Sequence, residues 1–326
     1  MSSINLTKKI FQTLVLATIF GGMMTAQALT ISPARIELSG DPGTTISDKF
    51  LLINEQENDQ TFYTSVENFQ AKGDSGAPSF SELKEGFSSW VTVTNQITLK
   101  KGERVEIPFS VHIPKDADAG GHFAAIFMST VPPSTKAGEL AVGAKVGMLM
   151  LLRVSGDIKE GGGVLSLSLK EGGFFTTSLP INFVYRFSNS GNDRANPTGT
   201  LSVRNMVGYK TEDLNANPSS GNVLPNSTRR FDVKWGDEDP LPASASFLNH
   251  VIYEARNFAF GPYFVNLHVA FGTSGVSDKF LFIFVFPWHL LIVVAIIGFI
   301  LFTILRLAVR KYNRFIIEQA RKAYTE

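Results

Sequence analysis

The chain has 326 residues, of which 18% are charged, a formal net charge of +1 and no cysteine. A charge this close to zero argues against nucleic acid as a partner. The lack of cysteine excludes disulfides, thiol catalysis, cysteine-ligated zinc and a lipoprotein anchor. Because secreted eukaryotic modules of this size usually carry disulfides, the composition favours a prokaryotic envelope protein.

Residues 1–28 have the pattern of an export signal. Two lysines, Lys8 and Lys9, precede an apolar run from Ile10 to Phe20, and Ala26-Gln27-Ala28 forms a small-residue cleavage site. A first transmembrane helix is the alternative, but threonines and a glycine pair interrupt the run, which is shorter than the roughly 20 residues of a full span. We therefore expect a signal peptide, with the mature chain beginning at Leu29.

The first half of the remaining chain alternates apolar and polar residues with a period of two, as half-buried strands do. An opening strand over Leu29–Leu38 is expected to be broken by Pro33 and to lie at a sheet edge. Further strands are expected at Lys49–Asn54, Thr61–Val66, Trp90–Val93, Val105–Ile113, His122–Thr130 and Gly143–Val154. Short strands at this spacing are typical of an immunoglobulin-like sandwich.

A glycine-rich break from Gly156 to Gly163 precedes a second series of strands. These are expected at Val164–Lys170, Ile181–Asn189, Gly199–Asn205, Thr228–Trp235, Pro262–Phe271 and Lys279–Phe286. The stretch Glu238–Phe258 fits either a loop or a short helix. The sequence therefore predicts an all-β body of two tandem immunoglobulin-like β-sandwiches, the first over residues 29–158 and the second over residues 159–286.

A second long apolar run, Leu290–Leu305, predicts one transmembrane α-helix over residues 287–308. A buried core helix is the alternative, but it would not be expected to end in a cluster of basic residues. By the aromatic-belt and positive-inside rules, the residues that mark the two membrane interfaces are Trp288 outside and Arg306, Arg310 and Lys311 inside. We expect the lipid bilayer as a partner, an extracytoplasmic body, and a basic cytoplasmic tail over residues 309–326.

No constellation of residues predicts catalysis. The string Gly73–Pro78 is one residue from the nucleophile loop of chymotrypsin-like proteases, but in that family the histidine base precedes the serine, and the first histidine here is His112. A turn between two strands explains the string. The acidic cluster Asp237–Asp239 is expected to be a solvated loop, with calcium binding as the alternative. We predict a non-enzymatic protein with no cofactor and no metal site.

Binding is the remaining class of function, because β-sandwiches bind through exposed edges and end loops. The possible binding residues are Arg35 on the opening strand, Trp90 behind an aromatic-rich loop, and His122 at the start of a strand after two glycines. For Trp90, a place in the hydrophobic core is the favoured alternative.

Many short motifs resemble bacterial surface proteins of the WxL-interacting type. They are Ile31–Glu37, Asp41–Gly43, Leu52–Glu55, Trp90–Val93, Leu99–Glu103, Ile113–Ala117 and Gly120–Ile126, followed by Phe187–Asn192, Pro197–Gly199, Asn217–Pro218, Gly221–Pro225, Arg229–Phe231, Trp235 and Gly261–Tyr263. The resemblance implies a peptidoglycan-binding domain, a second immunoglobulin-like domain, a transmembrane helix and a short basic tail.

The opening strand also resembles that of pilus-assembly chaperones, which have an arginine at the position that matches Arg35. Such chaperones are soluble, whereas this chain is expected to be tethered. We therefore predict a membrane-anchored bacterial cell-surface protein that engages cell-wall polymer such as peptidoglycan, or a surface protein. The alternative is a tethered, chaperone-like assembly factor for secreted or surface β-proteins.

Overall fold

The computed structural model describes residues 29–81, 85–132, 145–236, 239, 241–242 and 244–323. The expected signal peptide lies outside the described residues. The chain separates into two compact units. The described residues of the first unit are 29–69, 80–117 and 122–154 with the gaps given above, and the second unit comprises Gln70–Ser79, Asp118–Gly121 and the chain from Ser155 onward.

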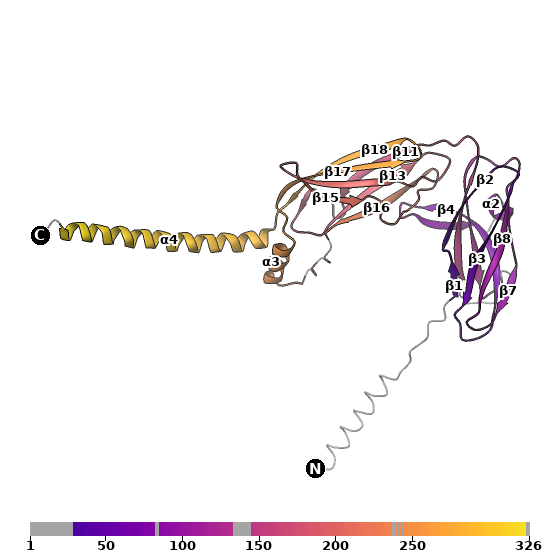
Figure 1. Cartoon of the computed structure of the whole chain (residues 1–326), viewed down its shortest axis with the longest axis horizontal. Helices are drawn as coiled ribbons and strands as arrows, with labels where there is room; N and C mark the ends of the chain where they lie inside the picture. Colours follow the sequence, from indigo (N-terminus) through magenta and orange to yellow (C-terminus); the bar gives the residue numbers. More distant parts are fainter. Residues whose placement is uncertain are drawn as a thin grey trace, which may run out of the picture. The chain divides into compact units, whose positions relative to one another are not determined.

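The first unit is built on two sheets (Figure 1). A four-stranded sheet has the order β1 (Leu29–Ser32), β3 (Thr45–Asn54), β8 (Arg104–His112) and β6 (Val91–Val93). A six-stranded sheet has the order β2 (Arg35–Gly40), β10 (Lys145–Val154), β9 (Gly120–Ser129), β4 (Gln60–Lys72) and β5 (Ala77–Ser81), and β7 (Gln96–Leu99) also pairs with β4. Alternate residues such as Phe50, Leu52, Met150 and Leu152 are buried and form a shared core between the sheets.

The opening strand is divided at Pro33, as expected. Before the proline, β1 pairs antiparallel with β3, and after it β2 pairs parallel with β10. In the described strand order, β1 is an edge strand of the four-stranded sheet and β2 is an edge strand of the six-stranded sheet. Proline has no N–H to donate to a neighbouring strand, so it suits the point at which the chain leaves one sheet for the other.

The second unit contains two further sheets. A three-stranded sheet has the order β11 (Gly162–Leu169), β13 (Ile181–Asn189) and β16 (Ser227–Trp235). A five-stranded sheet has the order β12 (Phe175–Thr176), β18 (Gly275–Val285), β17 (Gly261–Phe271), β14 (Thr198–Asn205) and β15 (Lys210–Asn215). The predicted all-β fold with two sandwiches is confirmed. The ambiguous stretch after Trp235 contains a helix, α3 (Phe247–Arg256).

Tyr185 connects the two sheets of the second unit. It is fully buried on β13, its ring stacks on Phe231 at 4.9 Å between ring centroids, and its hydroxyl donates to the carbonyl oxygen of Ala216 at 3.0 Å. Ala216 directly follows β15 of the opposite sheet. Burial raises the pKa of Tyr185, so the hydroxyl keeps its proton and remains a hydrogen-bond donor.

A buried asparagine organises a loop at one end of each sandwich. Asn54 is the last residue of β3, and its amide nitrogen donates to the carbonyls of Asn58, Leu99 and Lys100. Asn189 is the last residue of β13, and its amide donates to the carbonyls of Asp193 and Val223 while its oxygen accepts the N–H of Gly191. Each side chain satisfies backbone groups that leave the strand ladder and would otherwise be buried unpaired.

The chain ends in the helix α4 (Trp288–Ala323). Its portion Trp288–Ile317 is long and apolar enough to cross a membrane, with a mean hydropathy of 2.9 over its most apolar window. The predicted transmembrane residues, from Trp288 on, lie within it. The helix continues into the predicted basic tail, and β18 ends at Val285, so the second sandwich is joined to α4 by only two residues.

The Asn189→Ala variant tests the importance of the asparagine loop. It removes three hydrogen bonds from a buried site, and at about 1 kcal/mol net for each we expect a loss of about 3 kcal/mol in the free energy of unfolding. The measurement is denaturant unfolding of the purified chain. The matched control is Asn266→Ala on the exposed face of β17, expected to change stability by less than about 0.5 kcal/mol. Equal effects for the two variants would contradict the assignment.

Candidate functional site

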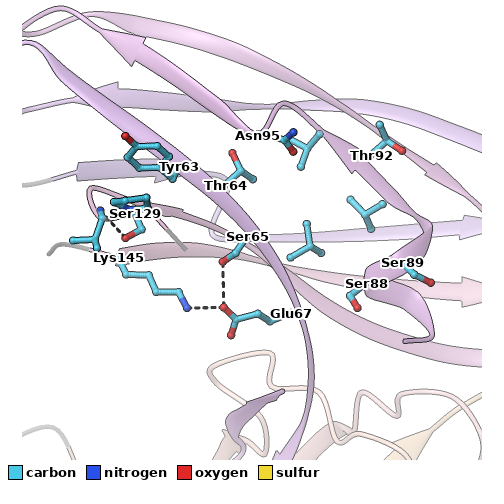
Figure 2. A pocket seen from close by; sticks show the side chains of 15 residues that line it. Tyr63, Thr64, Ser65, Glu67, Ser88, Ser89, Thr92, Asn95, Ser129 and Lys145 are labelled. Atoms are coloured by element: carbon cyan, nitrogen blue, oxygen red, sulfur yellow. Dashed lines mark hydrogen bonds and ion pairs between the residues drawn. The ribbon is translucent and has the colours of Figure 1, made fainter. Parts of the chain in front are cut away.

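A groove of about 670 Å³ opens on the first unit (Figure 2). Most of its described lining comes from β4, from α2 (Phe87–Trp90) with the adjoining β6, and from the chain after β9. The described residues that line it are Tyr63, Thr64, Ser65, Val66, Glu67, Ser88, Ser89, Val91, Thr92, Val93, Asn95, Ser129, Val131, Pro132 and Lys145.

One ion pair lies in this groove. The Nζ atom of Lys145 lies 2.6 Å from Oε1 of Glu67, and the hydroxyl of Ser65 donates to the same oxygen at 3.1 Å (Figure 2). The Glu67 side chain is only 9% exposed, whereas that of Lys145 is 42% exposed. The Lys145 amine also lies 4.2 Å from the ring centre of Phe127, and the face of an aromatic ring attracts a cation. The pair therefore neutralises a buried carboxylate and leaves the amine accessible.

The rest of the polar lining consists of hydroxyl and amide groups, which donate and accept hydrogen bonds without carrying charge. Valines on β4 and β6 supply apolar surface between these polar groups. Among the described lining residues there is no histidine or second carboxylate that would serve as a base beside a nucleophile. The groove is therefore chemically suited to binding a neutral, hydrogen-bonding or extended ligand.

Two of the predicted binding residues lie together. Trp90 ends α2 and His122 lies on β9, and their ring centroids are 4.8 Å apart. Phe87, which is buried, contacts both rings. Trp90 is partly buried and packs against the core of the first unit. This is the alternative role that the sequence suggested for it.

The third predicted binding residue lies elsewhere. Arg35 is the first residue of β2, and β10 separates this strand from β9, which carries His122. Its guanidinium forms an ion pair with Glu37 at 3.5 Å, and both side chains are 41% exposed. Arg35 therefore remains available at a sheet edge, apart from Trp90 and His122.

Ser75 lies in the turn between β4 and β5, where the sequence predicts a turn. Its Oγ accepts a hydrogen bond from the N–H of Ala77 at 3.2 Å. This is the local bond by which serine stabilises a turn. Asp237 and Glu238 of the acidic cluster lie outside the described residues.

The predicted anchor residues all lie on α4. Trp288 is its first residue, and Arg306 and Arg310 follow at about 27 and 33 Å along a helix that rises 1.5 Å per residue. Lys311 lies next to Arg310. This spacing brackets a hydrocarbon layer of about 30 Å.

Sequence reasoning did not anticipate that β2 pairs with only part of β10. In the described part of the chain, β2 pairs only with Leu149–Val154, the second half of β10. The N–H of Leu149 donates to the carbonyl of Ala34 on the β2 side. Because backbone groups alternate sides along a strand, the N–H and C=O of Lys145 and Gly147 point to that same side, beyond the end of the pairing with β2.

An exposed aromatic surface covers the outer face of the five-stranded sheet in the second unit. Phe280 and Phe282 alternate outward along β18, and Phe264 on the neighbouring β17 contacts both rings at 5.8 Å. Phe174 and Phe175 extend the surface towards β12 and are also exposed. Large exposed apolar surfaces of this kind mark contacts with other proteins or with membranes.

No family model matches the sequence, and no curated protein sequence is similar to it. Several solved structures are similar in fold. The crystal structure of the class 5 fimbriae chaperone CfaA has 14% identity and a TM-score of 0.37, with 78% of this chain and 99% of that chain covered. The Escherichia coli chaperone DraB has 12% identity and a TM-score of 0.33, with 78% of this chain and 96% of that chain covered.

A chain of the CsuC–CsuE chaperone–tip adhesion subunit complex of Acinetobacter baumannii gives 13% identity and a TM-score of 0.35, with coverage of 79% and 99%. At these identities the likeness concerns the immunoglobulin-like fold alone. None of these matches supports the expected relationship to WxL-interacting proteins, which stays a prediction.

The Lys145→Met variant tests the ion pair in the groove. It leaves the Glu67 carboxylate with only Ser65 as a described partner, and because Lys145 itself is partly exposed we expect a loss of about 1–2 kcal/mol in the free energy of unfolding. Adding Glu67→Gln removes the buried charge and should restore most of that loss. The measurement is denaturant unfolding of the single and double variants.

The matched control for this test is Lys49→Met. Its partner Glu106 is 60% exposed, and exposed pairs contribute less than about 1 kcal/mol. If Lys145→Met costs no more than Lys49→Met, the groove pair contributes no more to stability than an exposed ion pair does.

Proposed function

We propose that this chain is a single-pass, membrane-anchored binding protein whose extracytoplasmic sandwiches hold another β-protein by adding one of its strands to a sheet edge. The protein then acts as a tethered, chaperone-like assembly factor. The observation that carries this proposal is that, in the described part of the chain, the pairing with β2 leaves out the first half of β10. The same proposal includes two further points. The chain is not an enzyme, and it is oriented with its body outside and its tail in the cytoplasm.

Strand addition requires a row of accessible backbone donors and acceptors together with side chains that fix the partner's register. The backbone groups of Lys145 and Gly147, which lie beyond the described pairing with β2, would supply the first requirement. The second is supplied by Val146 and Met148, whose side chains alternate with them and face the sandwich core. A partner strand would therefore pair with the first half of β10, next to the point where the pairing of β10 with β2 begins.

The exposed aromatic surface on β17 and β18 favours a protein partner over a carbohydrate one. Sugar rings can stack on phenylalanine rings, but these rings offer none of the hydrogen bonds that sugar hydroxyls require. A folded or folding polypeptide would cover this apolar area favourably, by about 25 cal/mol for each Å² removed from water. This support is independent of the strand edge because it comes from the other unit.

Site-specific photo-crosslinking tests the strand-addition proposal. A photoreactive residue replaces Lys145, whose side chain is exposed at the start of β10, in cells that express the full chain. We expect crosslinks to extracytoplasmic proteins, with the crosslinked site within an alternating, strand-forming segment of the partner. The measurement is mass spectrometry of the crosslinked peptides.

The matched control places the same photoreactive residue at Arg153. This residue is also exposed on β10, but it lies in the half that pairs with β2 at Ser39. Crosslinks of equal yield and identity at both positions, or crosslinks to non-strand segments only, would argue against strand addition.

A second candidate function is binding of cell-wall polymer such as peptidoglycan, and the hydroxyl-rich groove favours it. Combining Ser89→Ala with Asn95→Ala removes two exposed polar groups from the lining, and at about 1 kcal/mol for each bond we expect a loss of tenfold or more in affinity. The measurement is cosedimentation of the detergent-solubilised chain with purified peptidoglycan. Ser47→Ala on the exposed face of β3 is the control, and absence of binding by the unaltered chain eliminates this candidate.

A further inference from the structure

One face of α3 is apolar and exposed. Leu248 and Ile252 lie one helical turn apart and are 67% and 52% exposed. They occupy the side opposite Glu254, which is buried. Asn249 and Arg256 flank the apolar pair on the exposed side. A helix of this pattern, apolar in the centre of its exposed face and polar at the flank, suits a membrane surface.

The buried face of α3 is joined to the first turn of α4. One carboxylate oxygen of Glu254 accepts the backbone N–H of Leu290 at 2.8 Å, and the other lies 2.6 Å from Nδ1 of His289. Leu290 is in the first turn, where helix N–H groups lack partners within the helix. Glu254 therefore holds α3 at the N-terminal end of the membrane-spanning segment.

Aromatic residues surround this junction. Phe247 of α3 packs against Trp288 and His289, with ring centroids at 6.2 and 5.4 Å. Phe260 contacts Phe286, and both rings are exposed. These aromatic side chains lie within a few residues of α3 or of the start of α4. We call the apolar residues Phe247, Leu248, Ile252, Phe258, Phe260, Phe286 and Trp288 the membrane-proximal patch.

We propose that the membrane-proximal patch enters the outer leaflet of the bilayer that α4 spans, with α3 lying in the interface between headgroups and acyl chains. The proposal rests on the membrane anchor of the proposed function and identifies lipid as the partner of this surface. The argument is that the membrane-proximal patch lies directly beside the start of the membrane-spanning helix. Trp288 marks the outer interface, and the Glu254 contacts keep α3 at that level of the helix.

Burial in lipid explains why large apolar side chains remain on the surface of α3. Leu248 and Ile252 are exposed to water only if nothing covers them, and moving their apolar surface from water into lipid is favourable. Arg256 and Asn249 lie where a helix in the interface meets phosphate and water. The patch would thereby fix how the second sandwich stands on the membrane, because α4 alone permits rotation about its own axis.

The lack of native cysteine allows a direct test by single-site spin labelling. The full chain, carrying Leu248→Cys or Ile252→Cys, is labelled and reconstituted into phosphatidylcholine vesicles. Collision with oxygen, which concentrates in lipid, is compared with collision with a water-soluble nickel chelate. Phe299→Cys in the middle of α4 is the lipid reference, and Leu165→Cys, exposed on β11, is the water reference.

We expect the ratio of oxygen to nickel collision at Leu248→Cys and Ile252→Cys to be several-fold higher than at Leu165→Cys and lower than at Phe299→Cys. Labels on α3 that behave as at Leu165→Cys, while Phe299→Cys reports lipid, overturn this proposal and leave the anchor standing. Labels on α3 that are shielded from both reagents also overturn it, because a protein surface then covers α3. If Phe299→Cys itself reports water, the anchor and this proposal fall together.

Discussion

A chain without cysteine must hold each sandwich by the packing between its sheets and by the hydrogen bonds that close its ends. The inward residues of the facing sheets supply the packing, as Phe183, Tyr185 and Phe187 do along β13. Asn54 and Asn189 supply the closure, because each satisfies several backbone groups where a strand gives way to a loop. Without them, the loops at these ends would bury unpaired carbonyls against an apolar core.

The strands of this fold follow from local pattern, and most of their positions could be predicted. Ile181–Asn189 alternates without interruption and has the predicted bounds. Pro33 marks the transfer between sheets because a local property, the missing N–H, decides it. The short strands β5, β7, β12 and β15 were missed, because a few residues carry too little alternation to distinguish them from a loop. Trp90 was expected to open a strand but ends the short helix α2 instead.

The candidate site could not be predicted in the same way, because it depends on strand order and register. Glu67 and Lys145 are 78 residues apart in sequence, and only the placement of β9 between β4 and β10 brings them together. Neither residue lies in a motif. The contact of Trp90 with His122 likewise joins α2 to β9. Both residues had been selected individually, and nothing in the sequence indicated that they would meet.

The partial pairing of β2 with β10 also has a physical explanation. Since β2 begins only at Arg35, after the chain has left the other sheet at Pro33, it reaches β10 too late to pair with its first half. The same proline that lets one strand serve two sheets therefore limits the described pairing of β2 to the second half of β10.

Exposed edges invite association with other chains, and proteins that keep one usually limit its length or its flatness. Here the part of β10 beyond its described pairing with β2 is short, and Lys145 at its start carries a charge that disfavours unspecific pairing. Tethering the chain to a membrane would limit it further, because anchored copies meet other strands only on the outer side of the bilayer. Under the proposed function, these features would keep this short part of β10 available to a specific partner strand.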